Sequence, residues 1–369
     1  MSYFDHNATT PIDDRVLEAM LPFLKSFHGN PSSLYRHGRI ARSAIDAARE
    51  QVAALAGAQA SQVIFTSGGT ESNNLALAIV PPQGKLAISA IEHPSITEPA
   101  LRLKRQGAHL SIIGVDADGL ITQAAVDRLI EDKPDLVSVM LANNETGAVQ
   151  DLSPHVQQLR AHGIRVHTDA VQAFGKIPVS FSQLGVQMMS LSSHKIYGPK
   201  GCGALVFEKD LEIKPILLGG GQEQGLRAGT ENVAAIVGFG KAAELAKAEL
   251  AQRGEQLLAL RNRLEEGLTA IPGLTLFAQR TNRLPNTIQF GIPEIDGEML
   301  LMKLDQKGIA VSSGSACASE GGMPSPVLMA MGVEKGLAKS AIRVSLGLGN
   351  TPAEISEFIN LLKVLVCQA

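Results

Sequence analysis

Short apolar runs alternate with segments of helical periodicity between residues 62 and 209. The apolar runs are QVIFTS, KLAISAI, HLSIIGV, DLVSVMLA, IRVHTDA, QMMSLSS and GALVFEK. Between them lie a stretch that begins near Glu71 and the segments SITEPALRLKRQG, TQAAVDRLI and SPHVQQLRAHG, which have apolar residues at helical spacing. Parallel strands are apolar almost throughout because helices cover both faces of their sheet. The pattern therefore predicts a mainly parallel sheet covered by helices.

The pattern changes towards the C-terminus. A long helical stretch from Asn232 to about Ile271 is followed by LTLFA, NTIQF, GEMLLMKLDQKG, IAVSS, AIRVSLG and a final amphipathic helix. Strands and helices without regular alternation are typical of an α+β arrangement. We expect an α/β protein in which residues 13–255 form a large domain, while residues 1–12 and 256–369 form a smaller α+β domain.

The composition fits a folded protein without affinity for nucleic acids or membranes. The chain has 369 residues, which favours two packed domains, and 45% of them are hydrophobic. With 33 basic and 36 acidic residues the net charge is -3, so the basic surface of a nucleic-acid-binding protein is not expected. Apolar runs such as VLMAMGV are too short to cross a bilayer. The first residues, MSYFDHNATT, do not resemble a secretory signal.

The three cysteines are Cys202, Cys317 and Cys367. Their odd number and wide spacing are typical of thiols in a reducing compartment rather than of a disulfide framework. A cytoplasmic enzyme is therefore expected. Free cysteines are usually small buried hydrophobes, which is the interpretation for Cys202 and Cys367. Cys317 lies among small polar residues in VSSGSACASEGG, and an exposed thiolate there would be a nucleophile.

Polar residues follow several of the predicted strands, where parallel α/β sheets bind their ligands. In FTSGGTESNN, Gly68, Gly69 and Thr70 join a strand to a helix and predict a phosphate site, unless they form an ordinary capped turn. In RVHTDAVQAFGK, Asp169 ends a strand three residues before Gln172. A buried carboxylate needs a partner, and a protonated pyridine nitrogen would serve. A helix N-cap is the alternative for Asp169.

Two further strand ends carry a lysine and a histidine. Lys195, in LSSHKIYGPKG, follows Ser192 and His194 and precedes a run of Gly and Pro. A lysine can form a Schiff base, and its two polar neighbours would hold a phosphate; a surface lysine is the alternative. His93, in IEHPS, would stack on a flat ring and move a proton, or else be a capping or core histidine.

These four strand ends together supply an amine, an acid, a stacking ring and a phosphate site, which are the groups that pyridoxal 5'-phosphate requires. In MLANNETG, Asn143 and Asn144 would reach the cofactor or substrate, or form a turn. Arg343, in AIRVSLG, would bind a substrate carboxylate or form a structural ion pair.

A series of motifs spans nearly the whole chain in the order found in a known enzyme family. They are YFDHNATTP, GNPSSL, FTSGGTESNN, EHPS, ANNETGAVQ, HTDAVQAFGK, SSHKIYGPKG, GGGQEQGLRAGTEN, PNTIQF, SSGSACAS and IRVSLG. Through them the chain resembles the NifS/IscS-like cysteine desulfurases, class V aminotransferases of fold type I. The resemblance implies an aspartate-aminotransferase-like fold and a pyridoxal-phosphate homodimer. It also implies that sulfur passes from L-cysteine to an acceptor such as an iron–sulfur scaffold, with L-alanine as product.

The resemblance also implies a role for individual residues. Lys195 corresponds to the Schiff-base lysine and the base at the substrate Cα, Asp169 to the partner of the pyridine nitrogen, and His93 to the stacking and proton-transferring ring. Arg343 corresponds to the ligand of the substrate carboxylate and Cys317 to the nucleophile that becomes a persulfide. Gln172 and Asn144 correspond to groups near the cofactor O3′ and, for Asn144, the substrate. The phosphate contacts correspond to Gly69, Thr70, Ser192, His194 and, across a dimer interface, Thr230.

Three departures and several rival functions remain open. Tyr35 replaces the family's usual histidine, His6 lies where Asn or Tyr is common, and Gly321 and Gly322 follow the cysteine. The rivals are transamination, selenocysteine lysis and a non-catalytic protein of the same fold.

No nucleotide-binding glycine motif follows a strand, and the glycines of GFGKAA lie in the long helical stretch, where close packing explains them. No cysteine or carboxylate ligands accompany His162 and His167, so no metal is expected.

Overall fold

The computed structural model describes residues 1–313 and 323–367. Cys317, Gly321 and Gly322 lie outside the described residues. A seven-stranded sheet has the order β2-β8-β7-β6-β5-β3-β4. The strands are β2 (Val63–Thr66), β3 (Lys85–Ser89), β4 (His109–Ile113), β5 (Leu136–Ser138), β6 (Arg165–Asp169), β7 (Met188–Ser192) and β8 (Gly203–Phe207). Neighbours from β7 to β4 are parallel, whereas β8 runs antiparallel to β7 and β2, so the predicted mainly parallel sheet is confirmed.

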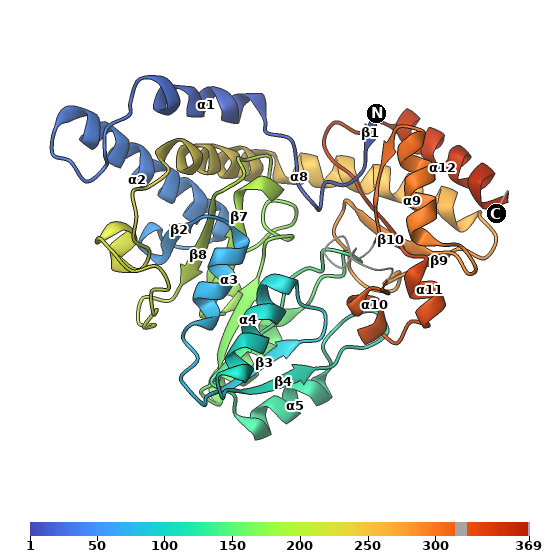
Figure 1. The fold of residues 1–369 in the computed structure, drawn as a ribbon, viewed down its shortest axis with the longest axis horizontal. Helices are drawn as coiled ribbons and strands as arrows, with labels where there is room; N and C mark the ends of the chain where they lie inside the picture. Colours follow the sequence, from blue (N-terminus) through green and yellow to red (C-terminus); the bar gives the residue numbers. More distant parts are fainter. Residues whose placement is uncertain (314–322, 368–369) are drawn as a thin grey trace.

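Helices pack around this sheet (Figure 1). They are α1 (Asp14–Lys25), α2 (Arg36–Ala56), α3 (Gly69–Leu77), α4 (Pro94–Arg105), α5 (Gln123–Asp132), α6 (Leu152–Ala161) and α7 (Phe181–Leu184), with 3₁₀ turns η1 (Ala60–Gln62), η2 (Ser193–Lys195) and η3 (Gln222–Gly225). The sequence analysis named neither α1 nor α2. Both are amphipathic, and the buried face of α2 includes Ala41, Ile45 and Val52.

Helix α8 (Val233–Thr269) begins directly after the predicted residue Asn232, whose side chain caps it by accepting from the Ala235 N–H. It runs across the molecule from α1 and α2 towards α9 (Gly297–Gln306) and α12 (Pro352–Cys367), as Figure 1 shows. The predicted close packing of its glycines is confirmed. A Cβ on Gly240 would lie 2.5 Å from the Cα of Ala48 on α2, and one on Gly238 would lie 2.6 Å from the sulfur of Met20 on α1.

The C-terminal region has a four-stranded antiparallel sheet in the order β12-β13-β10-β9. Its elements are β9 (Thr275–Leu276), β10 (Thr287–Gly291), α9 (Gly297–Gln306), β12 (Ser312–Ser313), α10 (Pro326–Ala330), α11 (Lys335–Lys339), β13 (Ile342–Ser345) and α12 (Pro352–Cys367). The predicted single strand IAVSS is wrong in one respect. Its first half is β11 (Ile309–Ala310), which pairs with β1 (Ser2–Tyr3), and its second half is β12, which pairs with β13.

Two large hydrophobic clusters correspond to the two regions. The first half of α8 packs into the cluster of the seven-stranded sheet through Phe239, and its second half packs into the C-terminal cluster through Leu264 and Leu268. The domain limits 13–255 and 256–369 stay a prediction. No helix within residues 1–313 and 323–367 combines the length and the apolar content that a membrane span requires.

Candidate functional site

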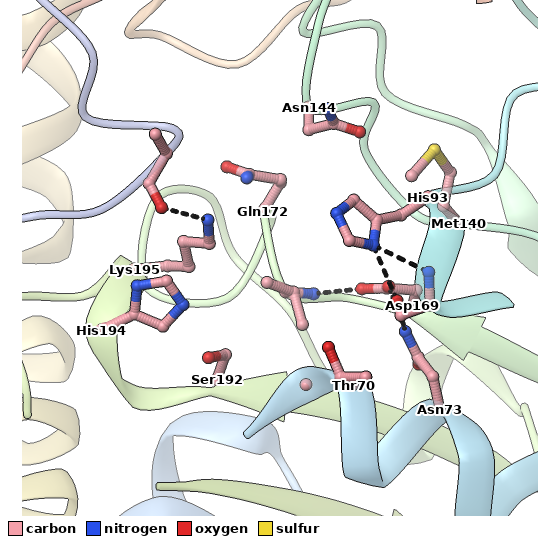
Figure 2. A pocket seen from close by; sticks show the side chains of 14 residues that line it. Thr70, Asn73, His93, Met140, Asn144, Asp169, Gln172, Ser192, His194 and Lys195 are labelled. Atoms are coloured by element: carbon pink, nitrogen blue, oxygen red, sulfur yellow. Dashed lines mark hydrogen bonds between the residues drawn. The ribbon is translucent and has the colours of Figure 1, made fainter. Parts of the chain in front are cut away.

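A cavity of about 280 Å³ lies where the carboxyl ends of the parallel strands meet the N-terminus of α3 (Figure 2). Nine of the predicted site residues line it: Gly69, Thr70, His93, Asn144, Asp169, Gln172, Ser192, His194 and Lys195. They come from segments that are far apart in sequence. The sheet brings them together because its parallel strands all end at the same edge.

Lys195 lies in the short connection between β7 and β8. This connection reverses the chain between two adjacent antiparallel strands, so the lysine projects from the end of the sheet. Its amine donates hydrogen bonds to the backbone oxygens of Asn7 and Ala8, at 2.6 and 2.7 Å. Lys195 is half-buried and lines the cavity, so the alternative of a surface lysine is wrong.

Asp169 is the single carboxylate among the described residues that line the cavity. It is 5% exposed. Its Oδ2 accepts from the Asn73 side chain at 2.7 Å, and its Oδ1 accepts from the Val171 backbone N–H at 2.9 Å. The chain continues from Asp169 in turns rather than in an α-helix, so the alternative of a helix N-cap is wrong. The two donors hold the carboxylate at the end of β6.

His93 caps α4, which confirms the capping alternative, and it also lines the cavity, while its stacking and proton-transfer role stays a prediction. Its Nδ1 accepts from the Ser95 backbone N–H at 3.1 Å and lies 2.8 Å from the Ser95 hydroxyl. The Asn73 side chain donates one hydrogen bond to that hydroxyl and another to Asp169. The hydroxyl proton is therefore directed at Nδ1, which leaves the proton of the neutral ring on Nε2.

The electrostatics of His93 agree with a neutral ring. Burial is the largest cause that lowers its pKa. The positive charges of Lys195 and Arg343 act in the same direction, whereas Asp169 opposes them. A neutral ring with a fixed tautomer is a hydrogen-bond donor through Nε2.

The floor of the cavity in Figure 2 has the features of an anion site. Gly69 and Thr70 begin α3, whose first backbone N–H groups favour a negative charge. A Cβ on Gly69 would lie 2.8 Å from a methyl of Val171, so glycine is required there. The hydroxyl of Ser192 is buried, with no hydrogen-bond partner among the described residues. Burial, followed by three nearby lysines, lowers the pKa of His194 to about 4.

The two neighbouring asparagines differ. Asn143 confirms the turn interpretation, since its side-chain oxygen accepts from the backbone N–H groups of Glu145 and Thr146, both at 2.9 Å. Asn144 lines the cavity. Its backbone oxygen accepts from Arg343 at 3.1 Å. A turn-forming residue and a cavity-lining residue thus occupy adjacent positions.

Arg343 and Thr230 do not line the cavity. Arg343 forms an ion pair with Asp5 at 2.7 Å, which confirms the structural alternative, and its Nε is buried without a partner among the described residues. Thr230 is exposed. Cys202 is buried and burial raises the pKa of its thiol, whereas Cys367 is exposed, so the prediction of a buried Cys367 is wrong. Cys367 ends α12 beyond the buried face of that helix.

Several residues of the site were not predicted from the sequence. Asn73, Ser95 and Met140 line the cavity, and Asn7 and Lys176 lie behind it. Asn73 and Lys176 stand inside motifs that were singled out for other residues, so the spacing of the motifs offered a signal. The departure His6 is buried edge-on against Tyr3, with ring centroids 4.9 Å apart, and does not line the cavity.

Three comparisons with known proteins agree. Residues 2–358 match the family model of the class-V aminotransferases. The chain is 42% identical to a protein of Dictyoglomus turgidum named cysteine desulfurase IscS, over 99% of this chain and 94% of that one. A solved NifS-like protein from Rickettsia africae superposes with a TM-score of 0.91 at 35% identity, covering 99% of each chain.

A further solved structure, described as SspA in complex with cysteine, has a TM-score of 0.82 at 32% identity over 94% of this chain and 99% of that one. The family match, the relative and the solved structures cover nearly the whole chain. This chain therefore belongs to the class-V aminotransferase family, among relatives named cysteine desulfurases and NifS-like proteins.

Proposed function

We propose that this protein is a pyridoxal-phosphate-dependent cysteine desulfurase that transfers the sulfur of L-cysteine to its own Cys317 and releases L-alanine. The observation that carries the proposal is the cavity itself, which brings an amine, a carboxylate and an anion site to one edge of a parallel sheet. Relatives named cysteine desulfurase and a similar protein described in complex with cysteine support the choice of substrate.

The residues present fit pyridoxal phosphate. Ser192 offers a buried hydroxyl that lacks a partner among the described residues, and the start of α3 adds backbone donors, as a phosphate group requires. Asp169 lies in the same cavity as an acceptor for a protonated ring nitrogen. The bound cofactor would supply an aldehyde for an amine and a ring that withdraws electrons from the substrate.

Each of four residues would then have its own role in the reaction. Lys195 would bind the cofactor, and its amine, once released, would take the proton from the substrate Cα. Asp169 would hold the ring nitrogen in its protonated form. His93 would donate a hydrogen bond from Nε2 into the cavity. Arg343 would bind the substrate carboxylate, and for this it would have to exchange its contact with Asp5, 2.7 Å away, for the substrate.

The sulfur step balances without an external oxidant. The Cβ–S bond of cysteine breaks, and a new S–S bond forms to the Cys317 sulfur. The sulfur is oxidised to the sulfane level while the carbon is reduced to the methyl group of alanine. The proton that the Cys317 thiol loses is balanced by the hydrogen that alanine gains at Cβ. Cys317 lies outside the described residues, so its role rests on the motif SSGSACAS.

The partners follow from the same proposal. A homodimer would bring the exposed Thr230 to the phosphate of the other subunit. The persulfide would pass to an acceptor such as an iron–sulfur scaffold protein, with tRNA thiolation or another thio-cofactor as further destinations. The cytoplasm is the expected compartment because the cysteine usage suits reducing conditions.

The test combines mass spectrometry with product analysis. The protein loaded with pyridoxal phosphate is treated with borohydride and digested; a reduced cofactor adduct is expected on Lys195. A second sample is treated with L-cysteine, and one added sulfur on Cys317 is expected together with one alanine. C317A should lose the persulfide, whereas the matched control C367A should keep it.

Two results would contradict the proposal. Wild-type protein without an adduct on Lys195 would exclude the cofactor. Sulfide release by C317A at the wild-type rate would exclude the persulfide and favour a lyase, such as one acting on selenocysteine.

A further inference from the structure

A second lysine lies behind the cavity. Lys176 follows Gln172 by four residues, and its amine donates to the side-chain oxygens of Gln172 at 2.7 Å and of Asn7 at 2.8 Å. Lys176 does not line the cavity. It forms no salt bridge among the described residues. A half-buried lysine amine without a carboxylate partner is costly, which suggests a use for its charge.

Asn7 connects this lysine with Lys195. Its side-chain oxygen accepts from Lys176, and its backbone oxygen accepts from Lys195 at 2.6 Å and from Gln172 at 2.9 Å. The Asn7 amide donates in turn to Thr287 at 2.9 Å, and the residue is 1% exposed. The two lysine amines therefore bind two oxygens of one rigidly held asparagine.

The charges around Lys176 are mostly positive. Burial is the main cause that lowers its pKa well below 10.5, followed by the charges of Lys195 and Arg343. Lys176 is also among the causes that lower the pKa values of His6 and His194, both to about 4. The carboxylate of Asp5 is engaged with Arg343. Repulsion between like charges is mutual, so a proton on Lys176 also disfavours a proton on its neighbours.

We propose that Lys176 is a positioning residue for Lys195: through Asn7 it fixes the oxygen that orients the Lys195 amine, and in its protonated form it favours the neutral, nucleophilic form of that amine. A lysine needs such help because an amine with an ordinary pKa near 10.4 is almost wholly protonated at neutral pH. A neighbouring cation is one of the established ways to activate a lysine nucleophile. The inference rests on the proposed function in that Lys195 is the residue which binds the cofactor.

Three variants separate the effect of the Lys176 charge on Lys195 from the effect of the Lys176 side-chain shape and hydrogen bonds. K176M removes the charge and the hydrogen bonds, K176Q keeps a donor without the charge, and K176R keeps the charge. The Lys176 amine is bound by two neutral side-chain oxygens and by no carboxylate among the described residues, so its removal leaves no unpaired charge, and K176M is expected to fold. K363M, at an exposed lysine of α12, is the matched control.

The first measurement needs no cofactor. The full-length cofactor-free protein is labelled with ¹³C-formaldehyde and borohydride over a range of pH, and the labelling rate of Lys195 is followed by peptide mass spectrometry. Only a neutral amine reacts. A like charge a few ångströms away shifts a titration by about 1–3 pH units. We expect the midpoint for Lys195 to rise by about one pH unit or more in K176M and K176Q, and K176R to return it towards the wild-type value.

The second measurement uses the protein loaded with pyridoxal phosphate, whose visible absorption is followed as a function of pH. The pH midpoint of this absorption change should shift in the same direction as the labelling midpoint, with the variants in the same order. A merely structural role for Lys176 would change stability without moving either midpoint. Labelling midpoints of K176M and K176Q equal to that of K363M would overturn the inference. A wild-type protein that takes up no cofactor would overturn the proposed function, whereas the labelling measurement would still decide the role of Lys176.

Discussion

The ion pair between Arg49 and Glu223 leads to a prediction in which the same substitution lowers stability in one background and raises it in another. The guanidinium donates to both carboxylate oxygens at 2.6 Å, and the two residues are 9% and 4% exposed. Arg49 also donates to the Val63 oxygen, while Glu223 accepts from the Phe65 backbone N–H. The pair therefore connects η3 to α2 and β2, and it positions the segment that leads from η3 to Thr230.

Removing one partner of a buried pair leaves an uncompensated charge and costs about 3–5 kcal/mol. E223Q and R49M should therefore each destabilise the protein by roughly this amount. In the double variant no charge remains, and the side-chain oxygen of the introduced glutamine can still accept from the Phe65 backbone N–H. R49M should thus be destabilising in the wild type and stabilising in the E223Q background.

Thermal unfolding followed by circular dichroism measures the effect. An unfolding entropy of about 2.1 cal/mol/K per residue gives roughly 0.8 kcal/mol/K for the 369-residue chain, so each single variant should lower Tm by about 4–6 °C. The double variant should melt above E223Q. Additive losses, with the double variant melting lowest of all, would refute the argument from unpaired buried charge.

Three further predictions concern the packing, the tautomer and the pH dependence. G240A should destabilise the protein by about 1–3 kcal/mol because its Cβ would meet the Ala48 backbone. G254A, on the same helix with open space around it, should instead stabilise by about 0.5–1 kcal/mol in denaturant unfolding. The ¹⁵N spectrum of His93, assigned by its loss in H93Q, should show a proton on Nε2 alone, and an Nδ1–H signal would exclude the assigned network. Burial raises the pKa of Glu92 from 4.5 to about 8, so the folded state binds a proton that the unfolded state releases. Wild-type stability should therefore fall relative to E92Q as the pH rises from about 4.5 to 8, and a constant difference in denaturant unfolding would contradict this.

The sequence predicted the elements that carry strong local signals. The bounds of α8 were found within two residues because Asn232 caps its start and apolar residues continue through both halves. Lys195, Asp169 and His93 were found because each follows an apolar strand and carries chemistry that a turn does not need. The split of IAVSS was missed because its two halves differ only in their partners, β1 and β13, which lie far away in the chain.

The residues behind the cavity were missed for a related reason. Lys176 and Asn7 are 169 positions apart, and Asn73 reaches Asp169 across 96 positions. Local pattern treats a lysine after a turn as a solvated charge, and an asparagine near a helix start as a cap. Only the folded chain, which brings the N-terminal segment to the connection between β7 and β8, makes these polar side chains partners of one another.

The distribution of charge in the cavity explains why a ligand would enter it in one orientation. Asp169 and His93 lie on one side of the view in Figure 2, and Lys195 and His194 lie on the other. Burial and the neighbouring lysines lower the pKa of His194 to about 4, so the histidine contributes a neutral hydrogen-bonding group near the start of α3. A ligand with a phosphate at one end and a protonated ring nitrogen at the other complements both sides only when the nitrogen faces Asp169. Reversing it would place a dianion against a buried carboxylate, which costs several kcal/mol. In the proposed function the Lys195 amine must be neutral when it reacts, and the Lys176 amine, held behind it at Asn7, would favour that form when protonated without entering the cavity.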